Sequence, residues 1–152
     1  MQSQKGKNVS IKKRTATNYI VVHCSATRAD MDIDIKEIDR WHKERGFEKV
    51  GYHDVIKRDG ECQVGRERDD MGAHVQGHNH ESIGICLVGG VDKKNRPENN
   101  FTEKQFASLK RLLRYYRVIY PKALIVGHCQ LDSGKACPSF SVPAWLQSVS
   151  IL

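Results

Sequence analysis

The chain has 152 residues, of which 39% are hydrophobic, enough for one domain with a single core and too few for two compact domains. No run of about 18 apolar residues occurs, so the sequence predicts no membrane span. The first 17 residues lack the apolar stretch of a secretory signal. We therefore expect the protein to be cytoplasmic when it is synthesised.

The net charge of +7 is concentrated at the N-terminus. Five basic residues and no acidic residue lie in the first 14 positions: Lys5, Lys7, Lys12, Lys13 and Arg14. Removing these five from the 25 Lys and Arg leaves 20 basic against 18 acidic residues. Because the charge of the rest of the chain is nearly balanced, it does not require a phosphate-binding face, and we expect no nucleic-acid partner. We divide the chain into a basic, flexible tail (1–17) and one domain (18–152).

The first predicted elements are a strand and a helix. The apolar run in NYIVVHCSAT predicts a buried strand that ends at His23. An amphipathic pattern then predicts a helix over about residues 35–45. Asp34 and Glu37 have the spacing of a capping box at its start, and Gly46 is placed to end it.

A hairpin and a second buried strand are expected next. In GYHDVIKRDGECQVGR, Asp59 and Gly60 separate two short strand-like runs, which predicts a type I′ turn. SIGICLVGG then predicts a buried strand. Between them lies the tripeptide His78-Asn79-His80, which superficially resembles a nuclease signature; we interpret it as a loop, because such motifs are not contiguous.

The last third of the chain predicts helix, strand and helix. Thr102 and Gln105 form a second capping box before a long helix that Pro121 stops. ALIVGHC predicts a strand that ends at His128, and a short helix should begin near Pro143. Strands interleaved with helices indicate an α/β fold with a mixed sheet, to which the hairpin adds an antiparallel part.

Two strand-end histidines suggest a metal site. A single His23 or His128 would more often be a hydrogen-bonded core residue, but two in similar positions, followed by Cys137, favour ligands. Two imidazoles and a thiolate leave a tetrahedral zinc one open position for water. Strand alternation predicts that Cys24 and Cys129 face the other way, into the core. The five cysteines are odd in number and contain no CxxC pair, which argues against a disulfide scaffold.

Other polar residues lie where a catalytic site could use them. Tyr52 and His53 begin the predicted hairpin, and His74 lies in the Gly-rich loop after it. Lys135 precedes Cys137 by two residues. A surface lysine is most often only solvated, but beside a metal ligand its ammonium group can stabilise a developing oxyanion.

The motifs VVHCSAT, RWHKERGF, GYHDVIKRDGECQVGR, HNHESIGICLVGG, FTEKQFASL and KACPSF occur in this order. Together, from about Tyr19 to Trp145, they resemble the small phage N-acetylmuramoyl-L-alanine amidases, within the wider group of zinc amidases and peptidoglycan recognition proteins. The resemblance implies hydrolysis of the amide bond between N-acetylmuramic acid and L-alanine by a phage or prophage lysis enzyme. It also implies a sheet with helices on both sides and a metal at the bottom of an open groove.

The resemblance assigns roles to seven residues. The implied ligands of one Zn2+ per chain are His23, His128 and Cys137; the implied catalytic residues are Tyr52 and Lys135; the residues placed near the cleft are His53 and His74. The substrate would be a muramyl peptide of peptidoglycan, reached after release or export. We expect a monomer.

Two departures and two rival functions accompany this interpretation. The segment between His128 and Cys137 is one residue longer than in similar phage enzymes, which could displace Lys135. Cys86 stands where many distant amidases carry an acidic residue. A recognition module without catalysis would typically lack the cysteine ligand, whereas a nucleic-acid-binding protein would owe its affinity to the positive charge.

Overall fold

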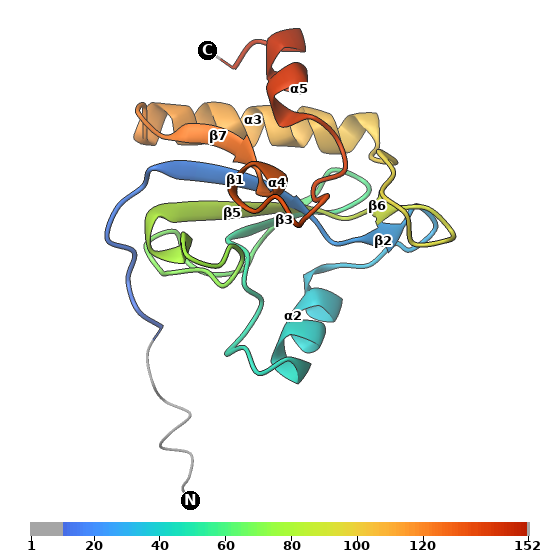
Figure 1. The fold of residues 1–152 in the computed structure, drawn as a ribbon, viewed down its shortest axis with the longest axis horizontal. Coiled ribbons are helices and arrows are strands. Elements are labelled where there is room, and N and C mark those ends of the chain that lie inside the picture. The colour runs from blue at the N-terminus through green and yellow to red at the C-terminus, as the bar shows by residue number, and fades with distance from the viewer. Residues whose placement is uncertain (1–10, 152) are drawn as a thin grey trace, which may run out of the picture.

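A computed structural model of the chain describes residues 11–151 and contains a mixed five-stranded sheet (Figure 1). Its strands lie in the order β4 (Cys62–Val64), β3 (Asp54–Ile56), β5 (Ser82–Leu87), β1 (Tyr19–Cys24) and β7 (Leu124–Gly127). All neighbours are parallel except β3 and β4, which form the predicted antiparallel hairpin. Short strands β2 (Thr27–Arg28) and β6 (Gly90–Val91) pair beside this sheet.

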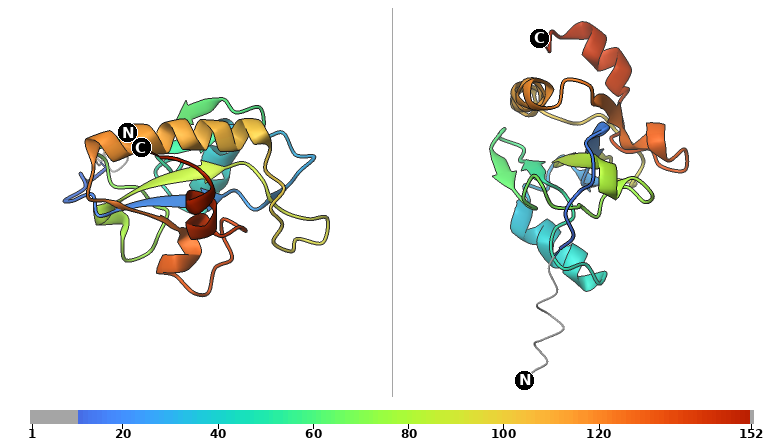
Figure 2. Two further views of the ribbon diagram at one scale, coloured as in Figure 1. Left: turned by 90° about the horizontal axis from the view of Figure 1, so that it is seen from above. Right: turned by 90° about the vertical axis from the view of Figure 1, so that its left-hand side faces the viewer.

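Helices cover both faces of the sheet, as predicted. They are α2 (Ile35–Glu44), the one-turn 3-10 helix η1 (Asn79–Glu81), α3 (Glu103–Ile119), α4 (His128–Leu131) and α5 (Val142–Ser148). α3 and α5 lie on one side of the sheet and α2 on the other (Figures 1 and 2). None of the helices in the described part of the chain combines the length and apolarity that a membrane crossing needs.

The alternation of side chains along β1 explains where the site lies. Ile20 and Val22 belong to the main core, which packs against α3 and α5. Val21 faces the other way, into a separate small cluster. Since alternate residues share a face, His23 follows Val21 to the α2 side, at the carboxyl end of the strand. The core thus fixes the face of the sheet on which His23 is presented.

Two local predictions about helix and turn chemistry were wrong. Asp34 caps α2 by accepting the N–H of Lys36, but Glu37 pairs with Arg40 instead of closing the capping box. In the hairpin, Gly60 has a φ of 91° while Asp59 does not share its positive φ, so the turn is not type I′. The Thr102–Gln105 capping box is present.

The N-terminal part of the described chain packs on the domain. Lys13 forms an ion pair with Asp70 at 2.6 Å, and the Nε of Arg14 donates to the carbonyl oxygen of Arg68 at 2.8 Å. The tail boundary at residue 17 stays a prediction, and Lys5 and Lys7 lie outside the described residues.

Candidate active site

Three predicted ligands converge at the carboxyl end of the sheet. One donor atom each from His23, His128 and Cys137 lies within 4.8 Å of the other two. The sheet register explains the meeting of the histidines: Val22 pairs with Gly127, so His23 and His128 each follow one member of the same pair. We predicted that His128 ends a strand, but β7 ends at Gly127 and His128 begins α4.

Cys137 is held in place by the backbone. The N–H of Cys129 donates to the carbonyl oxygen of Cys137 at 2.9 Å, and the N–H of Cys24 donates to its Sγ at 3.0 Å. A hydrogen bond with the Cys24 thiol, together with burial, raises the pKa of Cys137. A nearby cation is therefore needed to keep this sulfur as a thiolate at neutral pH. The prediction that Cys24 and Cys129 face away from the site into the core was wrong in part: Cys24 is buried but lines the groove and contacts Cys137, and Cys129 is half-buried on α4.

His23 receives its orientation from a buried hydrogen-bond chain. Its Nε2 lies 2.8 Å from Nδ1 of His74, whose Nε2 lies 3.2 Å from Oγ of Ser82. The Ser82 hydroxyl donates to the carbonyl of His78, so it accepts the Nε2 proton of His74. His74 Nδ1 must then accept from His23 Nε2, which leaves Nδ1 of His23 without a proton. That nitrogen is the one available to a metal.

Both histidines of the cluster favour the neutral form that metal binding requires. Burial, followed by the neighbouring rings of His74 and His128, lowers the pKa of His23 well below its ordinary value. Burial is also the main cause that lowers the pKa of His128. With two neutral imidazoles and one sulfur, the donor set fits zinc.

Tyr52 and Lys135 lie on the wall of the groove. The Tyr52 ring is 5.0 Å from the His23 ring, and burial raises the pKa of its hydroxyl well above the ordinary value, so the hydroxyl remains a donor. The Tyr52 ring packs against an apolar cluster that includes Cys86. Lys135 lines the groove from the turn before Cys137, despite the extra residue in that segment.

His53 lies behind the groove and does not line it. Its Nε2 is 2.8 Å from the carbonyl oxygen of Asp70, and its Nδ1 accepts the N–H of Gly84 at 3.0 Å. Burial lowers its pKa to about 4. With both nitrogens engaged by the backbone, His53 has the environment of a neutral core histidine.

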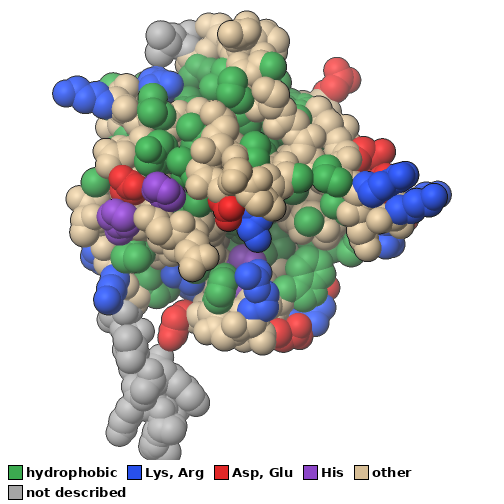
Figure 3. Space-filling model, viewed as in Figure 1, with side chains coloured by type: hydrophobic (Ala, Val, Ile, Leu, Met, Phe, Trp, Pro, Cys, Tyr) green, Lys and Arg blue, Asp and Glu red, His purple; other side chains and the backbone are tan. Residues whose placement is uncertain are grey.

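The groove above the three donors has a volume of about 680 Å³. Its walls include Trp41 and His42 of α2 and Arg45 at the end of that helix, together with Gln76 and Asn79 of the segment that leads into η1. Figure 3 shows this face of the molecule, with a histidine in a hollow between cationic side chains. The open groove predicted for the substrate is therefore present.

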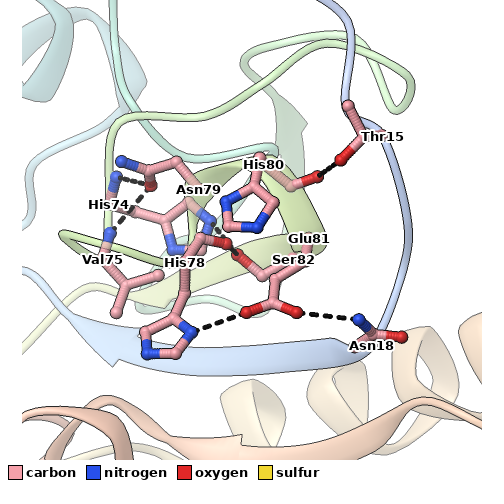
Figure 4. A network of polar contacts seen from close by, with 9 residues as sticks. All are labelled: Thr15, Asn18, His74, Val75, His78, Asn79, His80, Glu81 and Ser82. Carbon is pink, nitrogen blue, oxygen red and sulfur yellow. Dashed lines mark hydrogen bonds and ion pairs between the residues drawn. The ribbon is translucent and has the colours of Figure 1, made fainter.

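The loop that carries His74 is tied down by Asn79. Its Oδ1 accepts the N–H groups of His74 and Val75, each at 2.9 Å (Figure 4). Nδ1 of His78 lies 2.7 Å from Glu81. We predicted a loop for the tripeptide 78–80; His78 lies in a turn, and Asn79 and His80 begin η1, which supports the candidate metal site.

A second support holds the segment before Tyr52. His42 Nδ1 accepts the N–H of Gly51 at 2.8 Å, and Asp39 accepts that of Val50 at 2.8 Å. The guanidinium of Arg66 donates to three carbonyl oxygens, those of Lys49, Val50 and Met71. Sequence patterns gave no signal for these contacts, because each joins a side chain to backbone outside its own helix or strand.

Comparison with known proteins identifies the family. A family model described as N-acetylmuramoyl-L-alanine amidase matches residues 13–140. The chain belongs to this family. It is 48% identical over 140 residues to an endolysin of Enterobacteria phage K11, with 92% of each chain covered. It is 45% identical over 137 residues to an endolysin of Escherichia phage T7, with 90% of each covered.

A solved amidase has the same fold. The endolysin N-acetylmuramoyl-L-alanine amidase LysCS from Clostridium intestinale matches with a TM-score of 0.76 and 28% identity, over 90% of this chain and 84% of the other. The protein is thus an N-acetylmuramoyl-L-alanine amidase of the phage endolysin type, and its family implies a peptidoglycan substrate. Its His-His-Cys cluster is consistent with zinc.

Proposed function

We propose that this amidase holds one zinc ion between His23, His128 and Cys137. The convergence of their donor atoms within 4.8 Å supports the proposal most directly. When bound, zinc would supply a Lewis acid and lower the pKa of a water ligand toward about 7. The scissile bond is the amide between the lactyl group of N-acetylmuramic acid and L-alanine.

Lys135 and Tyr52 stabilise the developing negative charge. As the amide carbonyl is attacked, charge develops on its oxygen, and donors that are already in position act on it without reorganisation. Lys135 contributes an ammonium from one wall of the groove, and Tyr52 a protonated hydroxyl beside His23. Loss of one such donor costs about 10²- to 10³-fold in turnover.

His74 is a positioning residue in this proposal. Both of its ring nitrogens are engaged, with His23 and with Ser82, so it fixes the orientation of a ligand. His53 supports the backbone near the cleft. A monomer without a nucleic-acid partner stays a prediction.

The test is incubation of the reduced protein with purified muropeptides, followed by mass analysis. We expect free stem peptides, their loss after treatment with a chelator, and their return when zinc is added. Lys135→Ala and Tyr52→Phe should turn over about 10²- to 10³-fold more slowly at full zinc content. A recognition module would bind muropeptides without releasing a stem peptide. If either variant turned over at the wild-type rate, the catalytic role proposed for that residue would be wrong.

A further inference from the structure

The outer side of α3 carries a strong and uncompensated positive charge. Segment 103–122 has a single acidic residue, Glu103, and six cations, which we name the α3 cationic face: Lys104, Lys110, Arg111, Arg114, Arg117 and Lys122. Outside this segment and the first 14 residues, 14 basic residues stand against 17 acidic ones. The positive charge of the body is therefore concentrated on one helix and the turn that follows it.

Helical geometry puts the helix cations on one side. At 3.6 residues per turn, the five within α3 fall in an arc of about 140°, opposite the arc that contains Leu109, Leu113 and Tyr116. Those three residues are buried against the sheet. The arrangement leaves the cations pointing away from the core.

These cations lack carboxylate partners. Eight ion pairs occur among residues 11–151, and none includes a member of the α3 cationic face. The hydrogen bonds of its arginines go to neutral oxygens, such as Oγ of Ser108 and the carbonyl of Ala123. Cations elsewhere on the surface, such as Arg40 and Lys43, are paired. An unpaired cluster keeps its full charge for an anionic partner.

Exposed apolar side chains lie among these cations. Of the five large hydrophobic residues exposed in the described chain, three are on α3: Tyr115, Val118 and Ile119. Val118 is 81% exposed and Tyr115 is 50% exposed. Cations interspersed with exposed aliphatic and aromatic side chains are typical of surfaces that bind the headgroup region of a bilayer.

We propose that the α3 cationic face adsorbs to membranes that contain anionic phospholipid. Nucleic acid would use the cations alone and would leave Val118 in water, which makes it the weaker candidate. α3 lies on the face of the sheet opposite α2, whose residues line the groove (Figure 2). Adsorption through α3 would therefore leave the groove open to substrate. This proposal is independent of the zinc chemistry.

Co-sedimentation of the full chain with lipid vesicles tests the proposal. We expect binding to vesicles with about 30% phosphatidylglycerol in phosphatidylcholine at low salt, weaker binding at high salt, and none to pure phosphatidylcholine. Replacing Lys104, Lys110 and Lys122 together by Gln should lower the partition constant about a hundredfold, or about fivefold per lysine. None of the three side chains lines the groove, so muropeptide cleavage should be unchanged.

A control variant removes the same number of positive charges from another part of the surface. Lys36, Lys93 and Lys94, replaced together by Gln, lie outside the α3 cationic face and should change binding less than twofold. Val118→Asn should weaken binding, whereas Val64→Asn, at a side chain that is 74% exposed on β4, should not. Equal losses in the two lysine variants, no binding of the wild type, or binding only to duplex DNA would each overturn the proposal.

Discussion

Replacing His74 by Phe should weaken zinc binding without removing a ligand. Phenylalanine fills a similar volume but cannot accept the Nε2 proton of His23 or donate to Ser82, so the 2.8 Å and 3.2 Å contacts are both lost. Loss of a partner of this kind typically costs about 10- to 100-fold in metal affinity, or about 1.4–2.7 kcal/mol. The dissociation constant for zinc is measured by competition with a chromogenic chelator at neutral pH.

His53→Asn provides the matched control. His53 is a neighbouring buried imidazole that packs edge-on against the ring of His74 but forms side-chain hydrogen bonds only with the backbone, at Asp70 and Gly84. Its replacement should lower stability and leave zinc affinity within about threefold. Ser82→Ala should fall between the two. Wild-type zinc affinity in His74→Phe, or equal losses in both histidine variants, would refute the reasoning that the chain from Ser82 orients His23.

Three further predictions concern stability and the ligand set. Burial raises the pKa of Asp54 to about 6, so its ionised form opposes folding; as pH rises from about 4 to 7, this group alone lowers stability by up to about 3 kcal/mol, against the opposite slope that buried neutral histidines such as His53 contribute. Asp54→Asn should lack this slope in urea unfolding, and parallel pH curves would contradict the assignment. His42→Ala should cost about 1–3 kcal/mol by leaving a buried N–H unpaired, and His42→Gln less; equal losses in urea unfolding would exclude the hydrogen bond as the cause. Cys24→Ala should retain one zinc per chain by elemental analysis, since only Cys137 is proposed to bind it; loss of zinc would make Cys24 a ligand.

Much of the fold could be predicted from periodicity. The apolar runs gave β1, β5 and β7, and the capping pair at Thr102 and Gln105 gave the start of α3. The predictions of the hairpin turn type and of the capping box at Asp34 were wrong, because the same residues are compatible with several backbone conformations. Gly60 alone takes the positive φ in the hairpin, and Glu37 finds a closer partner in Arg40.

The site could be predicted only in part. The residue types and their motifs gave the three candidate ligands. Their supports were missed because His42, Asn79 and Arg66 hydrogen-bond to backbone groups outside their own helix or strand, at spacings that no capping or turn pattern predicts. Cys24 was assigned to the core from strand alternation, which gives the direction of a side chain but not what a later loop places against it.

X-ray absorption at the zinc edge tests the central claim most directly. For the reduced protein loaded with one equivalent of zinc, the account predicts one sulfur at about 2.3 Å and two imidazole nitrogens at about 2.0–2.1 Å, with the sulfur signal lost in Cys137→Ser. Two sulfur ligands, a sulfur signal that survives Cys137→Ser, or no bound zinc would contradict it.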